Sequence, residues 1–114
     1  MGQFEFVAWL VRWLLQQETF EFEWDKGNSA KSVQKHGVDL ESAEQVFNNK
    51  EYLVPLGIQV TPLTNEPRFG TLGMDLTGRL LAICFTIRNG KIRVISIRSM
   101  SRLERRKYAS LRKK

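Results

Sequence analysis

The sequence contains one cysteine, Cys84, and one histidine, His36, and this scarcity excludes several kinds of site. A single cysteine cannot form an internal disulfide, and these two residues cannot supply the ligands of a structural zinc site. A glycine-rich phosphate loop and a Ser/His/Asp catalytic set are also missing. We therefore expect no metal and no cofactor, and a lone thiol fits the reducing cytoplasm.

A hydrophobic run long enough for a membrane span is missing as well. The mainly apolar stretch Phe4–Leu15 is interrupted by Glu5 and Arg12. It is shorter than the ~20 residues of a transmembrane helix. It also lacks the basic start and small-residue cleavage site of a signal peptide, so we expect no membrane insertion.

On a helix, Glu5, Arg12 and Gln16 fall in one narrow sector, and apolar side chains cover most of the remaining circumference. We expect this helix to be buried by a second copy of the chain or by a partner protein. The alternatives are a membrane surface, or a core helix of a single subunit that leaves some apolar surface exposed.

The composition indicates one globular domain. The chain has 114 residues, of which 42% are hydrophobic and 11% aromatic. These fractions argue against disorder, and the length allows one modest core.

Positive charge is concentrated in the last third of the chain. Residues 79–114 contain twelve Lys or Arg and one acid, which gives +11, whereas residues 1–78 contain six bases and eleven acids, which gives −5 and a total of +6. A polyanion is attracted to such a surface, because each phosphate neutralised by Lys or Arg releases counterions. The asymmetry favours nucleic acid as a ligand.

The order of the expected elements predicts an α+β domain with an antiparallel β-sheet and helices packed at the N-terminus and C-terminus. Hydrophobic periodicity and turn residues define them. After the apolar helix we expect a strand at Phe20–Trp24, helices at Lys26–His36 and from Leu40, extended segments at Tyr52–Val60 and Arg68–Gly73, strands at Arg79–Arg88 and Lys91–Met100, and a terminal helix to about Arg112.

The hairpin around Asn89-Gly90 carries the clearest geometric prediction. Both turn residues tolerate positive φ, so a two-residue turn would pair Arg88 with Lys91. The same register makes Arg79 and Arg98 diagonal neighbours on one face, roughly 7–8 Å apart at the backbone. Two guanidinium groups at that distance could bind one phosphate bidentately. The alternative is that they are solvated charges at the edge of the sheet.

His36 ends a predicted helix in the sequence Lys35-His36-Gly37. Histidine is the usual acid or base near neutral pH, but a helix C-terminus also favours an imidazolium that caps the last carbonyls. The residues alone favour the cap. The terminal helix starts with the capping box Ser101-Arg102-Leu103-Glu104, and its Arg102, Arg105 and Arg106 extend the positive surface of the hairpin.

These motifs together resemble the BrnT family of bacterial ribonuclease toxins of type II toxin–antitoxin modules. The resemblance covers residues 20 to about 108. Its motifs in chain order are Phe22-Glu23-Trp24-Asp25, Lys35-His36-Gly37-Val38, Ala43 with Val46-Phe47, Gly78-Arg79-Leu80-Leu81, Arg93 to Arg98, and Glu104 to Tyr108.

The resemblance implies a RelE-like fold and RNA cleavage as the toxic activity. It also implies a ribbon-helix-helix antitoxin similar to BrnA and operator DNA bound through the complex. We expect a homodimer or a heterotetramer. Residues 20–114 would form the toxin domain and residues 1–19 an extra helical extension. That extension could cover the surface that an antitoxin would occupy, or reflect an upstream start site.

The predicted reaction is metal-independent attack of a ribose 2′-hydroxyl on the adjacent phosphodiester. Arg79 and Arg98 would stabilise the phosphate, and His36 or Lys35 would assist proton transfer. Arg68 and Arg93 would position RNA, and the terminal helix would hold its backbone. Two alternatives stay open, namely a module that binds nucleic acid without cleaving it and a protein that only binds an acidic antitoxin.

Overall fold

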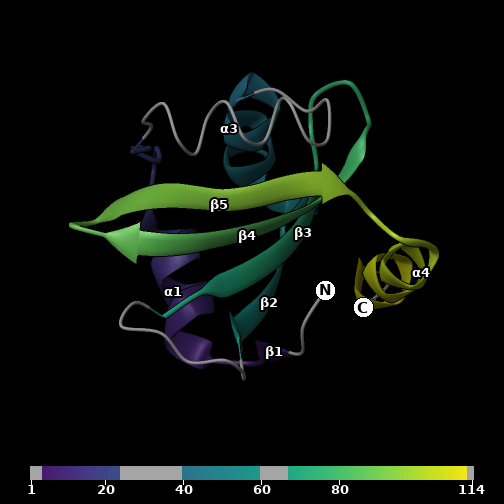
Figure 1. Cartoon of the computed structure of the whole chain (residues 1–114), viewed down its shortest axis with the longest axis horizontal. Coiled ribbons are helices and arrows are strands. Elements are labelled where there is room, and N and C mark those ends of the chain that lie inside the picture. Colours follow the sequence, from purple (N-terminus) through teal and green to yellow (C-terminus); the bar gives the residue numbers. More distant parts are fainter. Residues whose placement is uncertain (1–3, 24–39, 60–66, 113–114) are drawn as a thin grey trace.

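The computed structural model of the chain describes residues 4–23, 40–59 and 67–112. Its centre is a five-stranded antiparallel sheet whose strands follow one another in chain order. The elements are β1 (Phe4–Glu5), α1 (Ala8–Gln16), α3 (Leu40–Asn48), the 3-10 helix η1 (Lys50–Tyr52), β2 (Val54–Gln59), β3 (Phe69–Met74), β4 (Leu80–Arg88), β5 (Lys91–Ser99) and α4 (Arg102–Arg112). The predicted α+β class is confirmed, with helices near both ends of the chain (Figure 1).

The helices cover the two faces of the sheet unequally. Figure 1 shows α1 and α3 behind the sheet and α4 at one side, beyond the end of β5. Leu10 and Leu14 of α1 and Phe47 of α3 join inward side chains of the strands in the larger hydrophobic core. We call the sheet surface that faces α1 and α3 the inner face, and the opposite surface the outer face.

The β4–β5 hairpin forms the turn that the sequence predicts. Asn89 and Gly90 have φ values of 54° and 75°, and Arg88 pairs with Lys91. Positive φ at both central residues gives a turn whose twist matches the twist of the two strands. The pairing of Thr86 with Arg93 is also as predicted.

A β-bulge in β5 changes the register further from the turn. Phe85 pairs with Val94, but Cys84 pairs with Ser96, which leaves Ile95 as the extra residue. One extra residue moves every later side chain to the other face of the sheet. Arg98 consequently pairs with Ala82 and not with Leu81 as the uninterrupted register predicts.

The N-terminal segment packs against the same chain. Leu10 and Leu14 are fully buried in the larger core, whereas Phe6, Trp9 and Leu15 stay exposed. The helix is therefore a core helix of a single subunit that leaves some apolar surface exposed, which is one of the alternatives predicted from the sequence. A second copy or partner protein on that surface remains a prediction.

The start of the predicted N-terminal helix is wrong, because Phe4–Glu5 forms β1 and pairs with β2. The backbones come very close at Gly57, whose φ is +111° and where a Cβ atom would lie 2.0 Å from the carbonyl oxygen of Glu5. Glycine permits both the positive φ and this approach. The N-terminal segment is thereby joined to the sheet by backbone contact as well as by its helix.

In the described part of the predicted strand, residues 20–23, Phe22 forms a parallel bridge with Ile92 and no regular strand is present. The Glu23 N–H donates to the Ile92 carbonyl, and the Ile92 N–H donates to the Glu21 carbonyl. Phe22 packs on the larger core, which leaves Glu23 beside the basic end of the hairpin. The predicted helix Lys26–His36 lies outside the described residues.

The terminal helix begins with the predicted capping box. The Ser101 N–H donates to Glu104 at 2.8 Å, and the Glu104 N–H donates to the Ser101 hydroxyl at 3.2 Å. Tyr108 then docks the helix on a smaller core at the outer face, which contains Leu56, Leu72, Ala82 and Met100. Among the described helices, none is long and apolar enough to span a bilayer.

Candidate nucleic-acid interface

The outer face of β4 and β5 carries arginines that are predicted from the sequence to contact RNA. Arg93 pairs with Thr86 before the bulge and Arg98 pairs with Ala82 after it, and the alternation of side chains places both on the outer face. Arg68 precedes β3, and its charge acts on the thiol of Cys84, which also belongs to this face. In the described part of the chain no helix lies in front of β4 and β5 (Figure 1).

The predicted convergence of Arg79 and Arg98 is wrong. Arg79 precedes β4, and its Nη2 donates to the Ser42 hydroxyl of α3 at 2.9 Å, on the inner side of the sheet. Arg98 lies on the outer face. The bulge at Ile95 is the physical reason, because it reverses the facing of Arg98 relative to the register predicted from the turn.

Arg79 instead belongs to the turn between β3 and β4, which is built around Asp75. This carboxylate is 1% exposed and accepts hydrogen bonds from the Thr77 N–H and hydroxyl and from the Arg79 N–H and Nε. Burial opposes its ionisation, but the bonds from Thr77 and Arg79 outweigh burial and lower the pKa of Asp75. In the structure Arg79 therefore positions a loop.

Glu23 supports the basic side chains at the turn end of the hairpin. Nη1 of Arg88 and Nη1 of Arg93 both donate to Oε1 of Glu23, at 3.0 and 3.2 Å. Arg88 and Arg93 are diagonal neighbours across the hairpin, as the paired residues require. Two guanidinium groups thus gather around one carboxylate at this end of the outer face.

Arg98 and Glu104 form another ion pair of this surface, which links β5 to α4. Nη1 of Arg98 donates to Oε1 at 2.7 Å, and Nη2 donates to Oε2 at 2.9 Å. Burial works against ionisation of Glu104, but the Arg98 and Ser101 hydrogen bonds prevail and lower its pKa. The hydrogen bond to Glu104 raises the pKa of Arg98, so both groups stay charged.

Cys84 lies among these residues but is unsuited to nucleophilic chemistry. Burial raises the pKa of its thiol, and the positive charge of Arg68 offsets this only in part. A nucleophilic cysteine needs its thiolate, which a raised pKa disfavours. The polar chemistry of the outer face therefore comes from its arginines.

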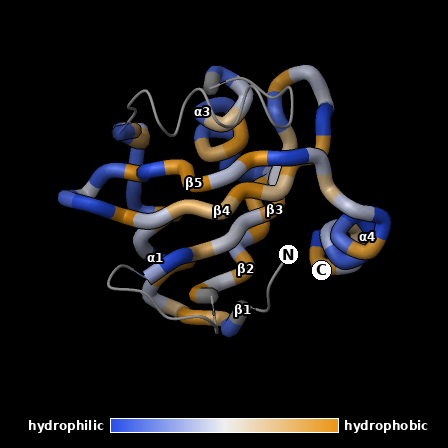
Figure 2. The backbone as a smooth tube through the Cα atoms, viewed as in Figure 1, coloured by the Kyte–Doolittle hydropathy of each residue, from blue (hydrophilic) through white to orange (hydrophobic). Residues whose placement is uncertain are grey.

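The predicted RNA-binding residues of α4 are placed on its exposed side. Arg102, Arg105 and Arg106 are all exposed. Arg102 and Arg106 lie well away around the helix axis from Tyr108, which faces the sheet, whereas Arg105 flanks Tyr108. Figure 2 shows the hydrophilic stretches of α4 and of both ends of β5. Lys35 and His36, the predicted proton-transfer residues, lie outside the described residues.

The two lowered carboxyl pKa values predict a loss of stability in acid. A carboxyl whose pKa is lower in the folded state stabilises the fold above its unfolded pKa, and this contribution disappears as the pH falls through the folded pKa. The ordinary values are 3.8 for Asp75 and 4.5 for Glu104, so the urea midpoint should fall as the pH drops below this range. Asp75→Asn should flatten this dependence and the exposed control Glu51→Gln should not; equal slopes would contradict it.

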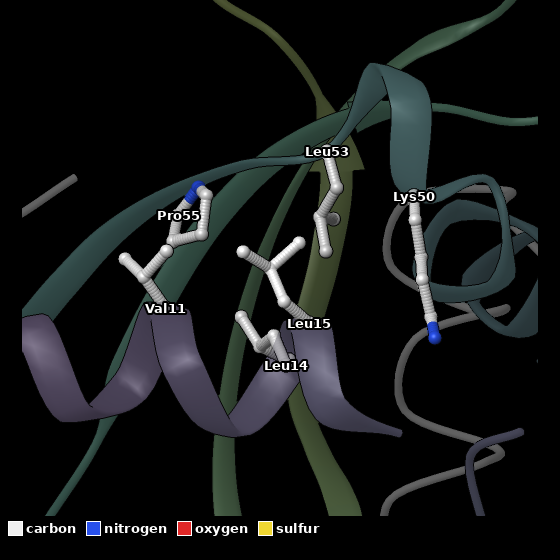
Figure 3. Close-up of a pocket in the computed structure, with 6 residues that line it drawn as sticks. All are labelled: Val11, Leu14, Leu15, Lys50, Leu53 and Pro55. Atoms are coloured by element: carbon white, nitrogen blue, oxygen red, sulfur yellow. The ribbon is translucent and has the colours of Figure 1, made fainter. Parts of the chain in front are cut away.

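A hollow of about 220 Å³ lies away from the charged surface, between α1 and the segment from η1 to β2. Figure 3 shows that its walls are mainly aliphatic, with Lys50 at one side. Val11, Leu14, Leu15, Leu53 and Pro55 complete the lining. It offers no acid–base pair, and the residues described by the structure contain no group of three His, Cys, Asp or Glu placed to hold a metal ion.

Sequence reasoning missed the carboxylates that orient the arginines. Glu23 reads as the polar side of a strand and Glu104 as part of a capping box, and both local explanations are incomplete. The register predicted from the turn is correct close to the turn, and it already makes Arg88 and Arg93 diagonal neighbours. No local pattern gives the contact between Glu23 and the hairpin, because its partners lie 65 and 70 positions away.

Comparison with known proteins relates the chain to ribonuclease toxins. The family model described as the ribonuclease toxin BrnT of type II toxin–antitoxin systems matches residues 24–104. A 1.1 Å crystal structure of the Brucella abortus ribonuclease toxin BrnT is similar, with 24% identity and a TM-score of 0.48, and the match covers 74% of this chain and 100% of that one. No curated protein matches the chain.

Proposed function

Because the chain belongs to the BrnT family of ribonuclease toxins of type II toxin–antitoxin systems, we propose that it cleaves RNA at the outer face of its sheet without a metal ion. The observation that carries this assignment of the surface is the placement of Arg68, Arg93 and Arg98 on one face, beside the exposed arginines of α4. Phosphate contacts of this kind position a nucleic acid regardless of its sequence.

The proposed reaction needs no group beyond those of the protein and RNA. The 2′-oxygen of a ribose attacks the adjacent phosphorus, the bond to the 5′-oxygen breaks, and the products end in a 2′,3′-cyclic phosphate and a 5′-hydroxyl. Arg98 stabilises the charge that develops on the phosphate, while Arg68 and Arg93 hold the flanking backbone. His36 or Lys35 takes the proton from the 2′-hydroxyl or delivers one to the leaving oxygen.

Incubation of the purified protein with a defined RNA in EDTA tests this reaction. We expect cleavage that leaves 2′,3′-cyclic phosphate ends, and no cleavage of the same strand with 2′-O-methyl groups, because the methyl group removes the nucleophile. At least one of the variants Lys35→Ala and His36→Ala should slow cleavage. Cleavage that requires an added divalent ion would contradict the proposed mechanism.

A second candidate is a homologue that binds nucleic acid or antitoxin but does not cleave RNA. The pairing of Arg88 and Arg93 with Glu23, and of Arg98 with Glu104, favours it, because these carboxylates neutralise part of the positive charge. The same assay separates the two candidates. Salt-sensitive binding of both the ribose and the 2′-O-methyl strand without any cleavage would support the second one.

We further propose a ribbon-helix-helix antitoxin of the BrnA kind as the partner, in a heterotetramer that binds operator DNA. The basic hairpin and α4 would attract an acidic segment of that partner, which would then exclude RNA. Co-expression with the neighbouring reading frame, followed by size-exclusion chromatography and an operator-binding assay, tests this. A free monomer or homodimer in the presence of that product would contradict it.

A further inference from the structure

The ion pair between Arg98 and Glu104 differs in geometry from the two ion pairs that Glu23 forms with Arg88 and Arg93. Arg88 and Arg93 each contact Glu23 through a single nitrogen, whereas Arg98 meets both carboxylate oxygens of Glu104 through the two terminal nitrogens of its guanidinium. The side chain of Glu104 is only 12% exposed and that of Arg98 is 28% exposed. A bidentate, half-buried pair fixes the plane of the guanidinium as well as its position.

The hydrogen bonds of Arg98 leave one particular edge for a ligand. A guanidinium has five N–H donors in a rigid fork. Two of them bond Glu104, and a third, on Nη1, bonds the Ser99 carbonyl at 3.1 Å. Within the described residues, this leaves Nε–H and the second hydrogen of Nη2, which are parallel and can bind two oxygens of one phosphate.

Glu104 is itself fixed from its other side. Its Oε1 accepts the Ser101 N–H at 2.8 Å, and its own N–H donates to the Ser101 hydroxyl. The capping box thus holds the carboxylate at the start of α4, while Tyr108 docks that helix on the outer face. The orientation of Arg98 is consequently tied to the position of α4.

We propose that Glu104 is a positioning residue, which holds the terminal edge of the Arg98 guanidinium so that its Nε–Nη2 edge binds the phosphate of the RNA. The phosphate contact follows from the donors that remain on Arg98, and the consequence for cleavage rests on the proposed function. Glu104 does not contact RNA. It acts by fixing the donor pair before the substrate arrives, which avoids reorganisation during the reaction.

Charge alone predicts the opposite result, which makes the inference testable. Glu104→Gln removes a negative charge next to the RNA surface and should by charge alone strengthen binding and leave the rate unchanged. If Glu104 positions Arg98, the outcome is different. The glutamine of Glu104→Gln presents an amide N–H to Nη2 in place of an acceptor oxygen, so the plane of the guanidinium is no longer fixed. We expect kcat to fall on the order of 10- to 100-fold, with KM equal or lower.

Glu51→Gln is the matched control, because it makes the same Glu-to-Gln change and removes the same charge at an exposed position outside the candidate site. Its kcat should equal that of the wild type at a temperature where both proteins are folded. In an Arg98→Ala background, Glu104→Gln should cause no further loss, since Glu104 acts through Arg98. A full additional loss there, or an unchanged kcat in Glu104→Gln, would overturn the inference.

The NMR signal of the Arg98 Nε–H provides a readout that does not depend on cleavage. Titration of the full chain with a short 2′-deoxy oligonucleotide should shift this signal in the wild type, and Glu104→Gln should broaden it before any ligand is added. A signal that does not respond at saturation overturns the inference even if RNA is cleaved. A shift in a protein that cleaves no RNA overturns the proposed function and leaves the phosphate contact standing.

Discussion

Replacing Arg98 with alanine is expected to lower the rate of RNA cleavage by about two to three orders of magnitude, the usual effect of removing one preorganised group that stabilises developing charge. Glu104 holds Arg98 at both terminal nitrogens, so the guanidinium is oriented before the substrate binds. Arg98→Lys should recover little of the rate, because a lysine cannot bond Glu104 and a phosphate through two parallel donor pairs. Single-turnover cleavage of a defined RNA in EDTA measures both variants.

Arg102→Ala is the appropriate control. It removes an exposed guanidinium at the start of α4, four positions after Arg98 in the sequence. We expect it to weaken binding a few-fold and to reduce the salt dependence by about one counterion, without a comparable loss in kcat. A circular-dichroism melt of each variant ensures that folded proteins are compared. If Arg98→Ala cleaves at the rate of Arg102→Ala, Arg98 does not stabilise the reacting phosphate.

The second large effect concerns stability and uses two adjacent leucines of α1. Leu14 is 1% exposed within the larger core, and Leu15 is 66% exposed. Leu14→Ala should lower the free energy of unfolding by about 3–5 kcal/mol, the cost of lost burial together with a cavity. Leu15→Ala should change it by less than about 0.5 kcal/mol, because surface substitutions away from special contacts have little effect.

Urea denaturation followed by tryptophan fluorescence measures both leucine variants. A destabilisation of Leu15→Ala that depends on protein concentration would reveal a second copy on the exposed side of α1. Similar small losses in both variants would mean that α1 does not contribute to the core in solution. The pair therefore also tests whether residues 1–19 can be removed without unfolding the protein.

Features determined by neighbouring residues could be predicted from the sequence. Asn89-Gly90 sets the turn and the first pairs of the hairpin, because its positive φ values are a local property. The capping box starting at Ser101 begins α4 for the same reason. The resemblance to the BrnT family, built from short motifs in the right order, is confirmed by the family match over residues 24–104.

Features that depend on distant contacts could not be predicted in this way. The bulge at Ile95 has no marker such as glycine or proline, and it alone separates Arg79 from Arg98. The burial of Leu10 and Leu14 depends on side chains of α3 and β3 to β5, which the pattern of α1 does not identify. Likewise, the distribution of charge along the sequence locates the basic third of the chain, but it does not identify the carboxylates that orient its arginine side chains.

Within the candidate site, the face of each arginine depends on its distance from the turn. Arg93 lies before the bulge, so its pairing with Thr86 follows from the turn alone. Arg98 lies beyond the bulge, and its partner in α4 follows from the packing of Tyr108. The positions of Lys35 and His36 relative to these arginines remain a prediction.

The order of the strands across the sheet is also the order in which the ribosome makes them. Since chains fold from the N-terminus as they are synthesised, each strand from β2 onward finds a finished neighbour to join. The acidic residues 1–78 leave the ribosome first, and the +11 of residues 79–114 arrives last. A nascent chain therefore acquires its attraction for RNA, including the ribosomal RNA around it, only after residues 79–114 have been made.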